Sequence, residues 1–255
     1  MLALAVVVGL LIGLVMGTLG GGGAVLSVPI LVFGFGLDPH DATTASLVIV
    51  GIGAVAGVLS HQHQGTVRWR EGLMVGALGA PAAVAGSWIA GSIDPNLLLA
   101  AFAALLVVVG VLMLRQSRKP ESRAPGRRRG AVAVVLTALG IGLLTGFLGV
   151  GGGFAMVPAL VLVLGFRMPV AVGTSLLVMT ISSAAALLTR AATGMQGLDW
   201  WLVGCFAAAA VAGTLIGGRL TARISSVSLQ RAFAVLLLVV AGYTATRAGL
   251  ALASG

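Results

Sequence analysis

The chain has 255 residues, of which 59% are hydrophobic and only 8% charged, and its net charge is +9. A soluble globular domain carries about 25% charged residues, so this chain has too little polar surface to cover a water-soluble globule. The composition therefore predicts an all-α polytopic membrane protein. The basic residues cluster between apolar runs, which is typical of charge that sets membrane topology rather than of nucleic-acid binding.

In the first half, two apolar arms at residues 2–16 and 24–36 flank a glycine cluster at residues 20–23. At 1.5 Å per residue each arm is about 20 Å long, which is shorter than the ~30 Å hydrocarbon core. We therefore expect a re-entrant hairpin or one broken and tilted helix. Three full-length helices are predicted over residues 42–60, 72–91 and 97–114. A polar, basic loop at residues 61–70 follows the first of them.

The second half repeats this plan after a basic linker. The linker, residues 115–130, contains seven Lys/Arg and separates a first repeat at 1–114 from a second at 131–255. The composition of the linker is typical of a solvated cytoplasmic loop. The second repeat has apolar runs at 131–146 and 153–165 around another glycine cluster, followed by helices over 170–189, 200–218 and 228–250.

One sequence frame occurs in both halves. The segments GTLGGGGAVLSVP (17–29) and GFLGVGGGFAMVP (146–158) share the pattern GxxGxGGxxxxxP at an offset of 129 residues. At the same offset, the TASL segment at 44–47 corresponds to GTSL at 173–176. We interpret this as an internal duplication. Each half is then a glycine-broken pair of half-helices followed by three transmembrane helices.

The distribution of basic residues favours inverted repeats. If each glycine segment re-enters on its own side, thirteen Lys/Arg lie on the face of the linker, and only Arg190 and Arg247 lie on the other. If each glycine segment crosses the membrane once, the halves are parallel and the split is eleven to four. Because cytoplasmic loops carry an excess of Lys/Arg, the first arrangement is favoured. The linker is cytoplasmic in both.

With its doubled glycine frame, its TAS and GTS triplets and its long central loop, the chain resembles the TauE/SafE family of sulfite-exporter-like permeases over nearly its whole length. This resemblance implies a bacterial inner-membrane permease that moves small anions, such as sulfite, sulfonates or related carboxylated compounds. It implies transport driven by ion gradients, without an ATP site or another cofactor. The expected partners are the anion and the lipid bilayer. A proton or sodium ion as coupling ion and a homodimeric assembly both stay open.

The glycine clusters and nearby hydroxyls are the candidate substrate site. Half-helices that begin near Ala24 and Gly153 can aim free N–H groups at an anion, and hydroxyls on the following helices can donate to sulfonate-like oxygens. The competing interpretation is that the glycines only permit close helix crossing and the hydroxyls bond to backbone carbonyls. The candidate substrate-binding residues are Gly20, Gly22, Gly23, Ala24, Thr43, Thr44, Ser46, Gly149, Gly151, Gly152, Gly153, Thr174 and Ser175, with Ser182 and Ser183 deeper along the same path.

Neither a catalytic nor a metal site is expected. His61 and His63 lack a neighbouring Cys or carboxylate that would complete a metal site. We interpret them as a polar loop end, with proton-linked gating as the alternative. Within the repeat, His61 corresponds to Arg190, whose charge either attracts anions or lies at the interface. The few carboxylates fall at helix ends or in loops, and Asp41 is expected to cap its helix, with a role in ion coupling as the alternative.

The sequence thus predicts a secondary transporter that alternates access around a midplane anion site between the two glycine breaks. An anion channel on the same scaffold and a non-transporting membrane assembly protein remain the alternatives. Cys205 is the chain's single cysteine, and with no metal-ligand cluster in the sequence it gives an assembly role little support.

Overall fold

The structure is a computed structural model that describes residues 2–90, 95–118, 131–148, 153–193 and 199–253. All regular structure in these residues is helical. The first half contains α1 (Leu2–Leu19), α2 (Gly22–Phe35), α3 (Pro39–His63), α4 (Trp69–Ala90) and α5 (Pro95–Ser117). The second contains α6 (Ala131–Leu148), α7 (Gly153–Leu162), α8 (Met168–Thr193), α9 (Trp200–Thr221) and α10 (Ser226–Ala253).

Five of the described helices, α1, α3, α8, α9 and α10, are long and apolar enough to cross a membrane. The all-helical membrane architecture predicted from the composition is therefore confirmed. The helices that follow the glycine clusters are short, with 14 residues in α2 and 10 in α7. In contrast, α1 continues past the predicted end at residue 16 to Leu19, and its 18 residues make it a candidate span rather than a short arm.

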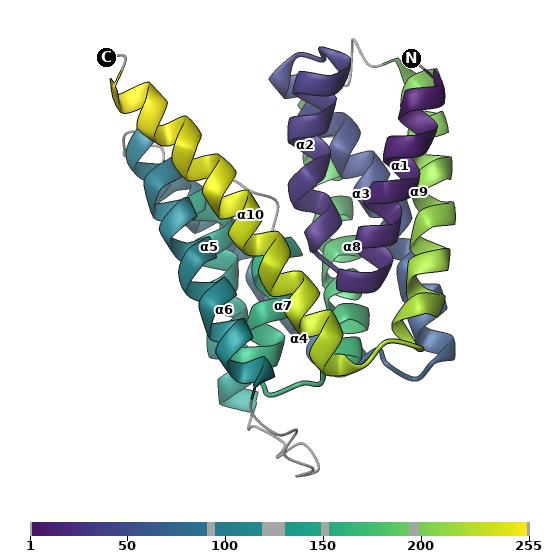
Figure 1. Ribbon diagram of the computed structural model, residues 1–255, viewed down its shortest axis with the longest axis vertical. Helices are drawn as coiled ribbons and strands as arrows, with labels where there is room; N and C mark the ends of the chain where they lie inside the picture. The colour runs from purple at the N-terminus through teal and green to yellow at the C-terminus, as the bar shows by residue number, and fades with distance from the viewer. Residues whose placement is uncertain (1, 91–94, 119–130, 149–152, 194–198, 254–255) are drawn as a thin grey trace.

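The long helices pair between the two halves of the chain. α1 lies along α9, α4 along α6, α3 along α8 and α5 along α10, while the short helices α2 and α7 touch each other (Figure 1). The α3–α8 pair is antiparallel, because Gly51 lies against Ser183 and Gly173 lies against His61. The two halves are therefore interlocked and do not sit apart as separate domains.

Small residues allow α1 and α9 to pack at close range. Gly9, Gly13 and Gly17 lie one turn apart on α1 and are buried. A Cβ on Gly213 of α9 would overlap the backbone carbonyl of Leu10. Close backbone approach through glycine is the usual basis of helix association in lipid, where no hydrophobic force drives helices together.

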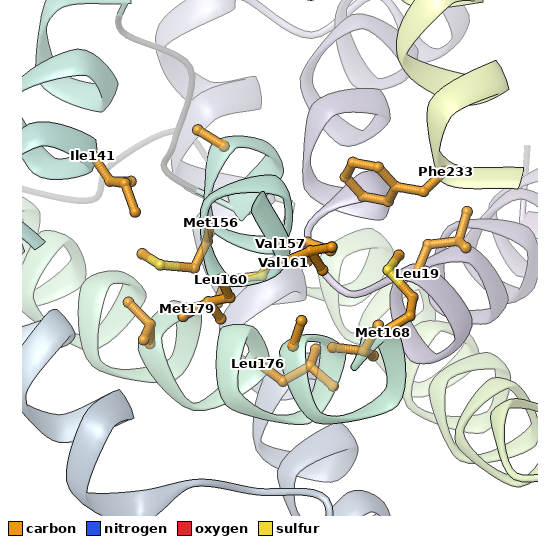
Figure 2. Packing of buried hydrophobic residues seen from close by; sticks show 14 of the residues in the cluster. Leu19, Ile141, Met156, Val157, Leu160, Val161, Met168, Leu176, Met179 and Phe233 are labelled. Carbon is orange, nitrogen blue, oxygen red and sulfur yellow. The ribbon is translucent and has the colours of Figure 1, made fainter. Parts of the chain in front are cut away.

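The main apolar core surrounds α7. Val157 and Leu160 of α7 are fully buried and pack in one cluster with Leu176 of α8 and Phe233 of α10 (Figure 2). Leu19, at the end of α1, belongs to the same cluster. The first glycine break is therefore held against the second half by packed side chains.

Exposed tryptophans mark the two ends of the helix bundle. Trp69 begins α4 and is 44% exposed, and Trp88, near its end, is 80% exposed. The rise between them is about 28 Å, close to the ~30 Å thickness of a hydrocarbon core. Tryptophan concentrates at membrane–water interfaces, so we expect these two side chains to lie at the two membrane boundaries.

Candidate functional site

The structure divides the predicted site residues into two groups at opposite ends of the α3–α8 pair. Thr174 and Ser175 lie near the start of α8, beside the first glycine cluster, whereas Thr43 and Thr44 lie near the start of α3. Between Thr44 and His61, which contacts the start of α8, the α3 axis rises about 25 Å. The candidates are therefore not gathered into one cluster at mid-membrane.

Gly20 is the point at which the chain leaves α1. Its φ of +72° is in the left-handed region that favours glycine, and its N–H donates to the Met16 carbonyl at 2.8 Å. A Cβ at this position would come within 2.5 Å of Ser175 Oγ and 2.9 Å of Val157 Cγ2. The first glycine break thus sits directly on a hydroxyl-bearing turn of the second half.

The other glycines of the first cluster are also in close contact with protein. α2 begins at Gly22, before the start predicted near Ala24. A Cβ on Gly22 would lie 2.7 Å from Leu236 Cδ2, and a Cβ on Gly23 would lie 2.6 Å from the Ile12 carbonyl oxygen. These contacts are those expected when glycine permits close helix crossing. Ala24 is partly buried against the main core.

The hydroxyls beside this break are buried and hydrogen-bonded. Ser175 Oγ donates to the Val172 carbonyl of its own helix at 2.8 Å, as the structural interpretation of this serine predicted. Thr174 Oγ1 accepts a hydrogen bond from the Arg68 backbone N–H at 3.2 Å. Thr174 therefore ties the start of α8 to the loop that precedes α4.

At the opposite end, an arginine binds the two threonines of the first half. The guanidinium of Arg190, near the end of α8, donates from Nη1 to Thr44 Oγ1 and from Nη2 to Thr43 Oγ1, the latter at 3.0 Å. Thr44 is buried, whereas Arg190 and Thr43 are partly buried. Ser46 is buried on the next turn of α3. The structure thus joins a basic residue to two of the predicted hydroxyls.

The prediction that His61 belongs to a polar loop was wrong. α3 continues to His63, and the His61 side chain is 0% exposed. Its Nε2 lies 3.1 Å from the Gly17 carbonyl oxygen and its Nδ1 lies 3.0 Å from Thr66 Oγ1. Because a carbonyl only accepts, Nε2 must carry a proton. These partners satisfy the imidazole inside the protein, and Gly173 leaves room for it.

The structure adds residues that sequence reasoning did not identify. Thr221 Oγ1 lies 3.1 Å from the Gly17 carbonyl oxygen and 3.0 Å from the Gly217 carbonyl oxygen of its own helix, so its one proton is shared between α1 and α9. Gln64 Nε2 donates to the Gly218 carbonyl at 2.9 Å. A threonine in an apolar helix gives no signal of this role on its own. The sequence feature that could have indicated the Thr221 contact is the position of its partner Gly17, just before the glycine cluster.

Some predictions cannot be placed. Gly149, Gly151 and Gly152 lie outside the described residues, and Gly153 is described only as the first residue of α7. The predicted cap at Asp41 was wrong, because α3 begins at Pro39 and Asp41 lies within its first turn. Within the described ranges, no three His, Cys, Asp or Glu side chains come together as metal ligands.

Long apolar spans and the helix pair broken at Gly20 define a multi-pass helical membrane protein. The sequence profile of the sulfite exporter TauE/SafE family matches residues 5–244, and the chain belongs to this family. The family resemblance predicted from the doubled glycine frame is therefore confirmed.

Several relatives carry transporter names. The chain is 34% identical over 245 residues to a "Probable membrane transporter protein" of Xylella fastidiosa strain Temecula1, covering 93% of this chain and 92% of the relative. It is 25% identical to "Probable membrane transporter protein YunE" of Bacillus subtilis strain 168, with 92% of each chain covered. "Probable membrane transporter protein MJ0441" of Methanocaldococcus jannaschii is 24% identical, over 77% of this chain and 75% of that protein. No solved structure gives a significant match.

Proposed function

We propose that the protein is a secondary transporter of small anions, sulfite- or sulfonate-like or related organic anions, that works by alternating access. Family membership and the names of the relatives support transport. The family name supports a sulfur oxyanion as the first substrate class to test. The bacterial relatives support the inner membrane as its location.

One observation supports the mechanism: each long helix of one half packs along a helix of the other half. α1 of the first half lies along α9 of the second half. Their counterparts in the duplication, α6 and α4, also lie along each other. α3 pairs with its own counterpart α8, and α5 with α10. Two copies of one unit related by a two-fold axis produce this pattern, and the antiparallel α3–α8 pair favours an axis across the helices, in the membrane plane. Inverted repeats of this kind support alternating access by rocking around a shared site.

The two ends of the α3–α8 pair support the same proposal. His61, near the end of α3, contacts Gly173 near the start of α8. Arg190, its counterpart at the offset of 129, donates to Thr43 and Thr44 near the start of α3. Equivalent residues of the two halves thus make equivalent cross-contacts, as an inverted repeat requires.

The proposed path follows the α3–α8 pair between the two polar groups. Near the middle of this pair, Gly51 lies against Ser183, where a Cβ on the glycine would be 3.2 Å from the serine Cβ. Ser183 is 4% exposed, and Ser182 precedes it on the same helix. In our proposal the anion passes this small, hydroxyl-bearing crossing at mid-membrane, while the glycine breaks and the terminal hydroxyls line its two ends.

Charge supports an orientation for this path. Exposed Arg68, Arg167 and Arg219 lie at the His61 end of the bundle. Because Lys and Arg concentrate in cytoplasmic loops, we place this end and residues 115–130 in the cytoplasm. Arg190 then lies near the opposite membrane surface.

Transport in proteoliposomes tests the proposal. Purified protein is reconstituted, a proton or sodium gradient is imposed, and uptake of sulfite, methanesulfonate and thiosulfate is followed. Accumulation of one anion above its outside concentration is expected, whereas downhill flux alone would indicate a channel. A thermal-shift screen of the same anions is run in parallel, because a bound substrate raises the unfolding temperature by mass action. If no anion moves and none stabilises the protein, the proposal is wrong.

A further inference from the structure

We infer that Arg190, held by Thr43 and Thr44, is the residue that recognises the negative charge of the substrate at the entrance opposite the linker. This inference rests on the proposed function and assigns a specificity-determining residue to its path. Its basis is the depth of the arginine, its partners, its exposure and the chemistry of its head group.

The depth of Arg190 follows from the parallel packing of α8 on α4. Gly72 of α4 lies against Leu177 and Gly76 lies against Ile181. Arg190 is about 13 Å beyond Ile181 along α8, and Trp88 is about 18 Å beyond Gly76 along α4. The Arg190 backbone is therefore about one helical turn inside the membrane boundary that Trp88 marks.

An arginine this close to the boundary could extend its side chain into interfacial water. The Arg190 guanidinium instead donates sideways to two hydroxyls of the other half. On the proposed topology, thirteen of the fifteen Lys/Arg lie on the cytoplasmic face, so Arg190 does not serve the charge bias that sets orientation. Ionisable groups held within a membrane protein are costly and usually functional.

The head group suits an oxyanion. A guanidinium presents its N–H donors in a planar fork that matches two oxygens of a sulfite or sulfonate group. Its bonds to Thr43 and Thr44 have neutral acceptors, and charge-assisted bonds to an ionised acceptor are roughly twice as strong. An arriving anion can therefore replace a threonine oxygen as the acceptor of a guanidinium N–H.

The two ends of the path differ in accessibility. His61, the counterpart of Arg190 in the duplication, is 0% exposed, with both ring nitrogens engaged by Gly17 and Thr66. Arg190 is only partly buried. In this conformation the arginine is thus the less enclosed of the two counterparts.

The test measures anion affinity in Arg190 variants. In proteoliposomes, R190Q is expected to raise the KM for the transported anion roughly tenfold or more, because charge-assisted hydrogen bonds are lost. R190K keeps the charge but loses the fork, and is expected to give an intermediate KM. R167Q is the matched control, because Arg167 is exposed at the opposite end, and its KM should equal that of the unmodified protein.

A second readout separates recognition from stability. The unfolding temperature of R190K without anion should stay near that of the unmodified protein, while its shift with the transported anion becomes smaller. If R190Q fails to fold, the KM and the anion-induced shift of R190K alone test the inference. An unchanged KM and anion shift in R190K or R190Q, with the unmodified protein active, would overturn this inference alone. If the unmodified protein neither moves nor binds any anion, the proposed function fails and this inference fails with it.

Discussion

The α1–α9 seam can be tested with two glycines of one helix, because their surroundings differ. Gly213 and Gly204 both lie in α9. A Cβ on Gly213 would overlap the Leu10 carbonyl and lie 2.8 Å from the Leu14 nitrogen, whereas a Cβ on Gly204 meets no described atom within 4 Å. The same change, glycine to alanine, is therefore predicted to act in opposite ways.

The loss of stability in G213A depends on whether the atoms that the new Cβ would meet can move aside. The atoms that a Cβ on Gly213 would meet are backbone atoms, so G213A must push α1 and α9 apart. Overpacking of this kind costs about 1–3 kcal/mol. Alanine also gains up to about 1 kcal/mol of helix propensity over glycine, but this gain is common to both variants and cancels in their comparison. We expect G213A to be about 1–3 kcal/mol less stable than G204A.

The assay is thermal unfolding of the purified proteins in detergent, followed by tryptophan fluorescence and by recovery on size exclusion. For a chain of this size about 1 kcal/mol corresponds to roughly 2–4 °C in the midpoint. G213A should thus unfold several degrees below G204A, and G204A should match or exceed the unmodified protein. Equal midpoints for G213A and G204A would refute the close packing of α1 on α9.

Three further substitutions test local features by the same unfolding measurement. T221V removes the hydroxyl shared between the Gly17 and Gly217 carbonyls and should cost about 0.6–1.7 kcal/mol; an unchanged midpoint would contradict a stabilising bond from α9 to α1. G20A and G36A both place alanine at φ near +70°, but only Gly20 is crowded, so G20A should unfold at the lower temperature and equality would exclude crowding. D199A removes the cap of α9 and should cost about 1 kcal/mol, with D199N close to the unmodified protein; equal losses in both variants would contradict capping.

The spans could be predicted because lipid leaves few alternatives for an apolar chain. Backbone groups in a bilayer must be satisfied within helices, so hydropathy alone located α9 and α2 to within a few residues. The predicted helix over 200–218 is Trp200–Thr221, and the predicted arm over 24–36 corresponds to Gly22–Phe35. The doubled glycine frame was equally readable, since glycine at a helix break is a local requirement of the backbone.

Helix ends were predicted less well where a polar residue finds a distant partner. The loop expected from residue 61 does not form there, because His61 reaches the Gly17 carbonyl, which is 44 residues away in sequence. No local pattern contains that bond. The same applies to the candidate site, whose members separate into two groups only because α3 and α8 are antiparallel. The sequence identified the hydroxyl-bearing residues, but the distance between the two groups depends on how the helices pack.

The two ends of the α3–α8 pair also show how a duplicated unit can have two unequal states. Identical halves related by an inverted axis would make the inward- and outward-open states equal in energy. Here one end carries His61, bound to Gly17 and Thr66, and the other carries Arg190, bound to two threonines. Each net hydrogen bond is worth about 0.5–1.5 kcal/mol, so a difference of one bond between the ends changes the ratio of two states by roughly two- to tenfold. Under the proposed mechanism, these two residues therefore set the resting balance, while the glycine seams, which both halves share, keep the scaffold the same in both states.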